Sequence, residues 1–496
     1  MSTIQKKSIQ STLIILAGFA LGALNLMVIQ PKVLTTEQFG LTRVIGDAAV
    51  TMATLCTLGC LPIIYKFFPF YKDYLPARKN DLPFVTGMIC LAGLIVMLFL
   101  GWLAKDIVIR KFSEKSPLFV GYSYLVYPYC FFMLSFMWLE SFSISFKKSN
   151  LSNALREFAP RILFTCFLGL YAFRIVDDKG FYTLFALSFS LPAVILFFVL
   201  RRTGEFLFVP TASSLTRKLR WKMTNFGLFL FGSQFLNLLS KTVDTFILSA
   251  KGSRGLTDAA VFTIATYVVT LMEIPQRSMN SVTVPVLAES WKNKNIARIK
   301  NIYNKSVTNL LLVGLAMFSL MCLNLDNLGK LLGNDFIGIG SVIFIMGIGK
   351  LIDLGTGANS QIIGTSSYWK VDFVTNVIYT LLALPLNYFL IAHFGLIGAA
   401  YSNLISLTFY NVLRFGFLWK QFGMQPYTWK DLLSIVLAGI LVLLLMHLPV
   451  FDNFIVDAVV RSGIFLLAFA LCIYLFKISD EAVEMANKYV RFKRPA

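Results

Sequence analysis

Residues 259–288 read AAVFTIATYVVTLMEIPQRSMNSVTVPVLA. The run is long enough to cross the roughly 30 Å hydrocarbon core of a membrane as a helix. Its middle nevertheless carries Glu273, Pro275 and Arg277. A charged side chain at the centre of a bilayer costs about 2.5 to 3.5 kcal/mol. We therefore expect this face of the segment to turn toward protein or a water-filled cavity.

The rest of the chain has the same apolar character. Of its 496 residues, 57% are hydrophobic and only 14% are charged, whereas a soluble domain carries about 25% charged residues. Apolar stretches of spanning length recur from end to end, and we count about 14 of them. The composition predicts an all-α polytopic membrane protein without a sizeable soluble domain.

The basic residues behind the net charge of +20 are distributed as the predicted topology requires. If the amino terminus lies inside, about 30 basic residues fall in cytoplasmic connections and about 12 outside, as the positive-inside rule requires. An even number of segments then leaves both termini in the cytoplasm. Topology and contact with anionic membrane lipids account for the charge, so we expect no nucleic-acid partner.

Short landmarks recur in order at nearly one spacing, among them Pro62 with Pro275 and Gly180 with Gly395. Internal repeats are common in transporter folds, although short matches also arise by chance in so apolar a chain. We predict two similar lobes around a central cavity. The predicted parts are an amino-terminal lobe of helices one to six (1–205), a basic cytoplasmic linker (206–223), a carboxy-terminal lobe of helices seven to twelve (224–420), and helices thirteen and fourteen with a basic cytoplasmic tail (421–496).

Polar residues form stripes on several predicted segments. In 259–288 they are spaced alternately by three and four residues, which places them on one face of a single helix: Thr263, Thr266, Thr270, Glu273, Arg277 and Asn280. Shorter stripes on other segments comprise Gln234, Asn237, Lys241 and Asp244 (segment 224–249), Lys350 and Asp353 (segment 336–357), and Arg43 and Asp47 (segment 42–65). Stripes on several helices favour one shared cavity over separate accidents.

Two readings of these stripes stay open. Glu273 and Arg277, Lys241 and Asp244, and Lys350 and Asp353 have the spacing of helical ion pairs, so each pair either serves a substrate or only holds helices together. Likewise Pro62 and Pro275 remove a backbone donor and should bend their helices. Each bend is then a hinge, a widened cavity or a tolerated kink.

Catalytic signatures are missing from the sequence. It contains no P-loop, HExxH, GxSxG or paired-cysteine metal spacing. The predicted external loops are also too short for the active site of a glycan polymerase. We therefore expect a transporter and not an enzyme, with no metal and no cofactor.

Three stretches resemble oligosaccharide flippases of the polysaccharide transporter family, in the multidrug/oligosaccharidyl-lipid/polysaccharide exporter superfamily. They are NLMVIQPKVLTTEQFGLTRV (25–44), VTVPVLAESWKNKNIARIKNIYNKS (282–306) and NSQIIGTSSYWKVDFVTNVIYTLLALPLNYFLIAHFGLIGAAYSNLISL (359–407). The matching positions are mostly turn and packing residues, such as Pro285, Gly364 and Gly398. They indicate a family without indicating a substrate site.

The resemblance implies a flippase in the bacterial cytoplasmic (inner) membrane that moves an undecaprenyl-pyrophosphate-linked oligosaccharide outward by alternating access. Its products would be O-antigen of lipopolysaccharide, capsule or exopolysaccharide, and the polymerase machinery would be a partner. Pyrophosphate needs cations in a low-dielectric cavity; the candidates are Arg277, Lys241 and Lys350, with Arg43 as a guide for the headgroup. Asp244, Asp353 and Glu273 would neutralise them and bind a coupling H+ or Na+.

Two transport alternatives remain. A peptidoglycan lipid-precursor flippase would also handle pyrophosphate. A cation-coupled multidrug antiporter of the same superfamily would need carboxylates without matching bases, whereas the stripes here carry about one base per acid.

Overall fold

We analysed a computed structural model that describes residues 17–484, apart from residues 19, 147, 449–450 and 482. The described residues form helices and connecting turns, with no strand among them. The predicted all-α class is confirmed. The chain divides into two compact units, Met1–Ala260 and Val261–Ala496, and the boundary falls inside α14 (Leu256–Thr270).

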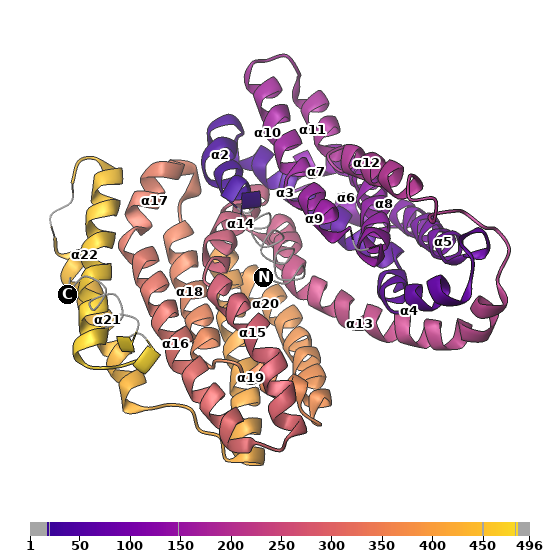
Figure 1. The fold of residues 1–496 in the computed structure, drawn as a ribbon. Helices are drawn as coiled ribbons and strands as arrows, with labels where there is room; N and C mark the ends of the chain where they lie inside the picture. The colour runs from indigo at the N-terminus through magenta and orange to yellow at the C-terminus, as the bar shows by residue number, and fades with distance from the viewer. Residues whose placement is uncertain (1–16, 19, 147, 449–450, 482, 485–496) are drawn as a thin grey trace, which may run out of the picture. The chain divides into compact units, whose positions relative to one another are not determined.

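Unit 1 contains the helices up to α13 and the first turn of α14 (Figure 1). They are the π-helix η1 Asn25–Ile29, α2 Gln30–Val33, α3 Thr36–Cys56, α4 Cys60–Tyr74, η2 Ala77–Lys79, α5 Leu82–Leu103, α6 Lys105–Phe112, α7 Pro117–Tyr122, η3 Ser123–Leu125, α8 Val126–Ser145, α9 Ser149–Glu157, α10 Ala159–Ala172, α11 Asp178–Ala186, α12 Ser190–Arg201 and α13 Ser214–Lys251.

Unit 2 contains the remainder of α14 and the following helices. They are α15 Glu273–Lys292, α16 Ile296–Leu323, α17 Leu325–Leu332, η4 Asn334–Phe336, α18 Ile339–Gly355, α19 Asn359–Thr365, α20 Trp369–Phe422, α21 Trp429–Met446 and α22 Phe454–Leu475.

Close backbone packing holds the centre of unit 1 together. Helix α8 packs on α3, α4 and α12, and α13 packs on α3 and α4. A Cβ atom at Gly93 of α5 would lie 2.3 Å from the carbonyl oxygen of Cys56, so only glycine permits this approach of α5 to α3.

Two of the apolar clusters in unit 2 show how its helices pack. One joins α15, α16, α19 and α20 through Leu287, Tyr303, Ile362 and Leu418. The other joins α16 to α21 and α22. Helix α20 is interrupted at Gly395, whose φ of 56° and ψ of −133° are not helical.

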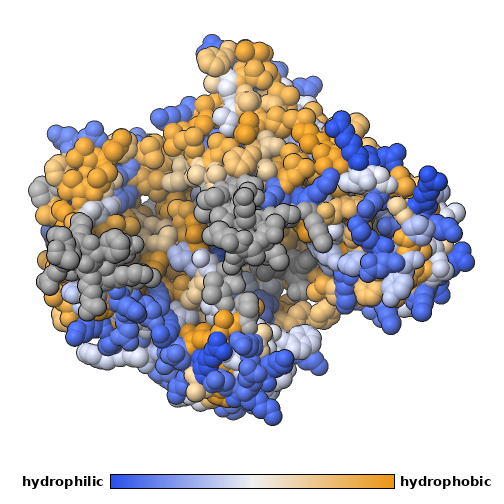
Figure 2. Space-filling model, viewed as in Figure 1, coloured by the Kyte–Doolittle hydropathy of each residue, from blue (hydrophilic) through white to orange (hydrophobic). Residues whose placement is uncertain are grey.

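The outer surface of both units is rich in apolar side chains, which form broad areas on the face shown in Figure 2. Phe99 and Trp102 of α5 are 57% and 69% exposed, and Leu467 of α22 is 75% exposed. Monomeric soluble proteins rarely expose apolar patches beyond a few hundred Å². Together with the long helices, this surface is that of a multi-pass membrane protein.

Within the described residues, eight helices are long and apolar enough to span a membrane, or up to ten if each of two bent pairs is one span. The predicted total of about 14 is not confirmed by that number. The two compact units also do not test the predicted repeat or the predicted lobe boundaries, which stay predictions.

The predicted bend beside Pro275 is confirmed, but the prediction of a single helix over 259–288 is wrong. The segment is two helices, α14 and α15, separated at Leu271–Met272 and bent by 45°. The break lies one turn before Pro275, because a proline nitrogen cannot donate to the carbonyl four residues earlier, which is that of Leu271. Pro62 likewise stands third in α4, after a break at Thr57–Gly59.

Candidate substrate site

The breaks in two bent helices of unit 2 meet at a cluster of charges. Glu273 opens α15 directly after the break, and Lys350 and Asp353 lie in the last turns of α18 before a second break, where α18 and α19 are bent by 47°. Lys350 Nζ lies 2.8 Å from Glu273 Oε1 and 2.9 Å from Asp353 Oδ2. The ionic bonds thus join the two discontinuous helices where regular backbone hydrogen bonding is lost.

Arg277 extends this cluster on the next turn of α15. Its Nη2 donates to Glu273 Oε2 at 2.7 Å, so Glu273 is shared between two cations. The order of charges is Arg277, Glu273, Lys350, Asp353, which alternates in sign and sums to zero. An acid at the first turn of a helix is also favoured by the helix dipole.

The two cations, Arg277 and Lys350, differ in solvent exposure. The Arg277 side chain is 67% exposed, whereas that of Lys350 is 12% exposed. A guanidinium has five N–H donors, and a single side-chain bond, to Glu273, is found for Arg277 among the described residues. Arg277 can therefore accept an anion without first leaving Glu273, but Lys350 cannot be reached without opening two ion pairs.

Asn411 of α20, which the sequence analysis missed, completes the cluster. It donates to Asp353 Oδ1 at 3.0 Å and accepts from Thr356 and Asn359 at 2.8 and 3.1 Å. The asparagine is 1% exposed. The sequence feature that indicates it is the polar pair Asn411 and Arg414, which lies in an otherwise apolar stretch.

The break between α14 and α15 divides the remaining predicted residues of segment 259–288. Thr266 and Thr270 lie on α14, where Thr270 donates to the Thr266 carbonyl at 2.7 Å. Asn280 lies on α15. The Thr266 hydroxyl and Asn280 Oδ1 are buried without a hydrogen-bond partner among the described residues.

A second set of predicted residues lies in unit 1. Arg43 Nε is 3.0 Å from Asp47 Oδ2 on α3. Asp244 of α13 is 6% exposed and interacts electrostatically with Asp47, and neighbouring Thr51 and Thr242 hydroxyls approach to 3.5 Å. The structure therefore places Asp244 with Asp47 inside unit 1, while the charged residues of segments 259–288 and 336–357 form the cluster of unit 2.

Some predictions lie beyond what the structure tests. The side chains of Gln234, Asn237 and Lys241 fall outside the described residues, so the pairing of Lys241 with Asp244 stays a prediction. The bend before Pro275 is observed, but its use as a hinge, and that of Pro62, also stays a prediction.

Comparison with solved structures identifies the fold. Over 95% of this chain and 99% of the other, it is similar to a lipid II flippase, MurJ, in an inward closed conformation, with a TM-score of 0.67 and 14% identity. Over 82% and 94% it is similar to an inward-facing multidrug resistance MATE family transporter of the MOP superfamily, with a TM-score of 0.66 and 14% identity. A MOP superfamily transporter from Pyrococcus furiosus gives a TM-score of 0.54 at 13% identity, over 87% and 96%.

The chain thus has the fold of these membrane transporters, and in unit 2 it carries a polar cluster where two bent helices are interrupted. A family model described as polysaccharide biosynthesis protein matches residues 4–291, more than half of the chain. The chain therefore belongs to that family. No curated protein matches it.

Proposed function

We propose that this protein is a flippase that moves an undecaprenyl-pyrophosphate-linked oligosaccharide across the bacterial cytoplasmic membrane by alternating access, with both termini in the cytoplasm. The glycan would enter O-antigen, capsule or exopolysaccharide, and the polymerase machinery would receive it. Family membership and fold support transport in polysaccharide biosynthesis; the lipid carrier and the direction are the proposal.

The observation that supports the proposal is the exposed guanidinium of Arg277, which lies beside a set of ion pairs with no net charge. A pyrophosphate oxygen pair fits the planar fork of arginine. Lys350 would keep Glu273 in place while Arg277 turns to the phosphate, so Lys350 acts by positioning. Neutral hydrogen-bonding groups such as Asn280 and Thr266 would meet sugar hydroxyls.

The charges of the unit 2 cluster, taken by themselves, do not favour a multidrug cation antiporter. A cationic drug needs a carboxylate that no base already neutralises, yet Glu273 bonds to both Lys350 and Arg277, and Asp353 bonds to Lys350 and Asn411. A proton or Na+ that couples transport would most simply use Asp244, whose Oδ1 has no hydrogen-bond partner among the described residues. Asp353 and Glu273 would need to leave Lys350 first.

The test is to delete the gene and identify the lipid-linked glycan that accumulates in the membrane. The proposal predicts an undecaprenyl-pyrophosphate oligosaccharide of the surface-polysaccharide type, cleared when the wild-type gene is restored. Accumulation of a peptidoglycan precursor would instead identify a cell-wall flippase. Unchanged lipids with increased sensitivity to cationic drugs would identify an antiporter.

A further inference from the structure

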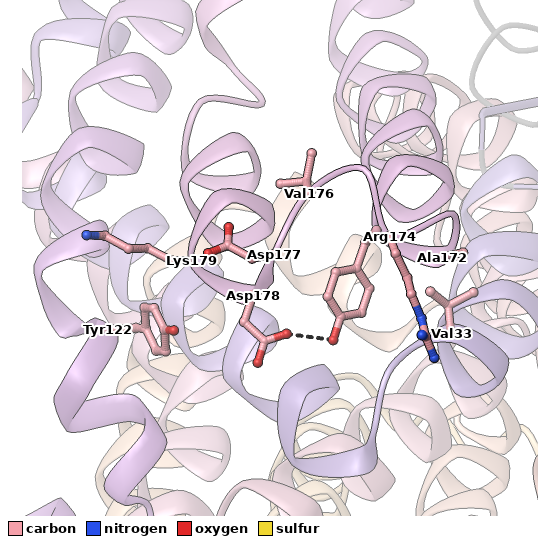
Figure 3. Close-up of a pocket in the computed structure, with 9 residues that line it drawn as sticks. Val33, Tyr122, Ala172, Arg174, Val176, Asp177, Asp178 and Lys179 are labelled. Atoms are coloured by element: carbon pink, nitrogen blue, oxygen red, sulfur yellow. Dashed lines mark hydrogen bonds between the residues drawn. The ribbon is translucent and has the colours of Figure 1, made fainter.

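A separate pocket of about 720 Å³ lies at one end of unit 1, within the range of small-molecule sites. Four helix ends meet there: Val33 ends α2, Tyr122 ends α7, Ala172 ends α10, and Asp178 begins α11 (Figure 3). Under the predicted topology, with the amino terminus inside, these helix ends would lie on the external side.

A chain of hydrogen bonds fixes the floor of the pocket. Gln38 Nε2 donates to the Tyr171 hydroxyl at 3.0 Å, and this hydroxyl donates to Asp178 Oδ1 at 2.7 Å, the bond drawn in Figure 3. Asp178 is thereby held as an oriented acceptor in an exposed position. Its second oxygen is available to a hydroxyl donor.

Charges of both signs line the opening of the pocket. Arg174, Asp177, Asp178 and Lys179 line it, and their formal charges cancel. Asp177 is already used, because it accepts from the Gly180 amide at 2.9 Å as the cap of α11. The Arg174 side chain makes no hydrogen bond or ion pair with another described residue, although its backbone is held at φ 57°, a conformation uncommon outside glycine.

Aromatic side chains form the apolar part of the pocket. The Tyr122 ring packs against Tyr182, with 4.6 Å between the ring centroids. The Tyr182 hydroxyl is buried without a hydrogen-bond partner among the described residues. Tyrosine combines an apolar ring with a polar tip, which suits a ligand that has both C–H faces and hydroxyl groups.

The tip of the same α10–α11 connection carries apolar side chains. Phe173 and Ile175 are 81% and 69% exposed. Exposed apolar patches mark contact sites with a membrane or a protein, and we assign this tip to the membrane surface. The pocket would then lie at the level where the headgroup of a lipid leaves the bilayer.

We propose that this pocket binds a neutral, hydroxyl-rich sugar. A sugar hydroxyl both donates and accepts, and so can use the Asp178 carboxylate and the Arg174 guanidinium together. The pocket would receive the glycan of the translocated lipid on the external side, and this biological role rests on the proposed function.

The test measures saturation-transfer NMR from the full chain, purified in detergent, to glucose, galactose and N-acetylglucosamine at millimolar concentration. The pocket variants are Tyr122→Leu, Asp178→Asn and Arg174→Asn; asparagine tolerates the left-handed backbone at 174. The matched controls are Tyr124→Leu and Asp106→Asn, an exposed tyrosine and an exposed aspartate that do not line the pocket.

We expect transfer to at least one sugar in the wild type and a roughly tenfold weaker affinity in the pocket variants, the change that the loss of one hydrogen bond to a charged group produces. The controls should match the wild type. The Arg174 variant removes no side-chain hydrogen bond or ion pair to a described residue, so it tests binding even if Asp178→Asn weakens the fold.

The inference is overturned if the wild type binds none of the sugars, if the pocket variants bind as well as the controls, or if inorganic phosphate displaces the sugar. Failure of the proposed function is separate. A protein that binds sugar in the pocket but does not clear the accumulated lipid-linked glycan retains this site and loses the flippase assignment.

Discussion

Replacing Lys350 with methionine should destabilise unit 2 more than the removal of any exposed charge. Lys350 is 12% exposed and bonds to Glu273 and Asp353, whose side chains are 29% and 15% exposed. Its removal leaves two carboxylates facing each other in a largely dry site. Breaking a buried ion pair costs 3–5 kcal/mol. Because Glu273 keeps Arg277 and is partly solvated, we expect the low end, about 3 kcal/mol.

The assay is thermal unfolding of the purified protein followed by fluorescence or circular dichroism. A loss of about 3 kcal/mol corresponds to a fall of about 6 °C or more in the unfolding temperature. The control is Lys330→Met on α17, an exposed lysine, which should change stability by less than about 0.5 kcal/mol.

Adding Glu273→Gln and Asp353→Asn to Lys350→Met should recover most of the loss, because a neutral hydrogen-bonded set replaces the uncompensated charges. An unfolding temperature of Lys350→Met equal to that of the control would refute the account of Lys350 as the bond between the two broken helices. So would a triple variant less stable than the single one.

Three further predictions concern other contacts. Pro275→Ala should let the amide at 275 donate to the Leu271 carbonyl and straighten the 45° bend. The transport rate should then fall without a fall in the unfolding temperature. Transport at the wild-type rate would show that the bend is not a hinge. Arg461→Met should lower the unfolding temperature by removing the bonds to Asp457 and to the Leu445 and Leu448 carbonyls, at a cost of about 3 to 5 kcal/mol, whereas exposed Arg110→Met on α6 should not. The hydrogen bond from Lys305 lowers the pKa of Glu481 below its usual 4.5. This contact therefore stabilises the fold above about pH 4.5, and its contribution is lost as the pH falls through the lowered pKa. A difference in unfolding temperature between wild type and Glu481→Gln that grows as the pH falls would contradict it.

Contacts within one helix could be predicted from the sequence, and contacts between helices could not. The spacings of Glu273 with Arg277 and of Lys350 with Asp353 predicted two ion pairs that the structure contains. The bond of Lys350 to Glu273 depends on how α15 and α18 pack, which periodicity does not encode. Asn411 was missed for the same reason, since one polar residue in an apolar segment does not reveal its partner.

The helix break shows a second limit. The alternation of polar residues from Thr263 to Asn280 matched one helix face, and Pro275 predicted a bend. Whether a proline bends a helix or ends it depends on what satisfies the freed carbonyl groups. In this protein the turn at Leu271–Met272 takes that role, so Glu273 and Arg277 occupy the start of a new helix.

The most direct test of the central claim is flipping of an undecaprenyl-pyrophosphate oligosaccharide by protein reconstituted in liposomes, compared between the wild type, Arg277→Ala and Arg298→Ala. Arg298 is the matched control, because it is 45% exposed and pairs with a glutamate, Glu289, in the same unit. The account predicts that Arg277→Ala folds with a loss of at most about 1 kcal/mol yet no longer flips the lipid, while Arg298→Ala flips it at the wild-type rate. Wild-type flipping by Arg277→Ala would contradict the assignment of Arg277 to the pyrophosphate.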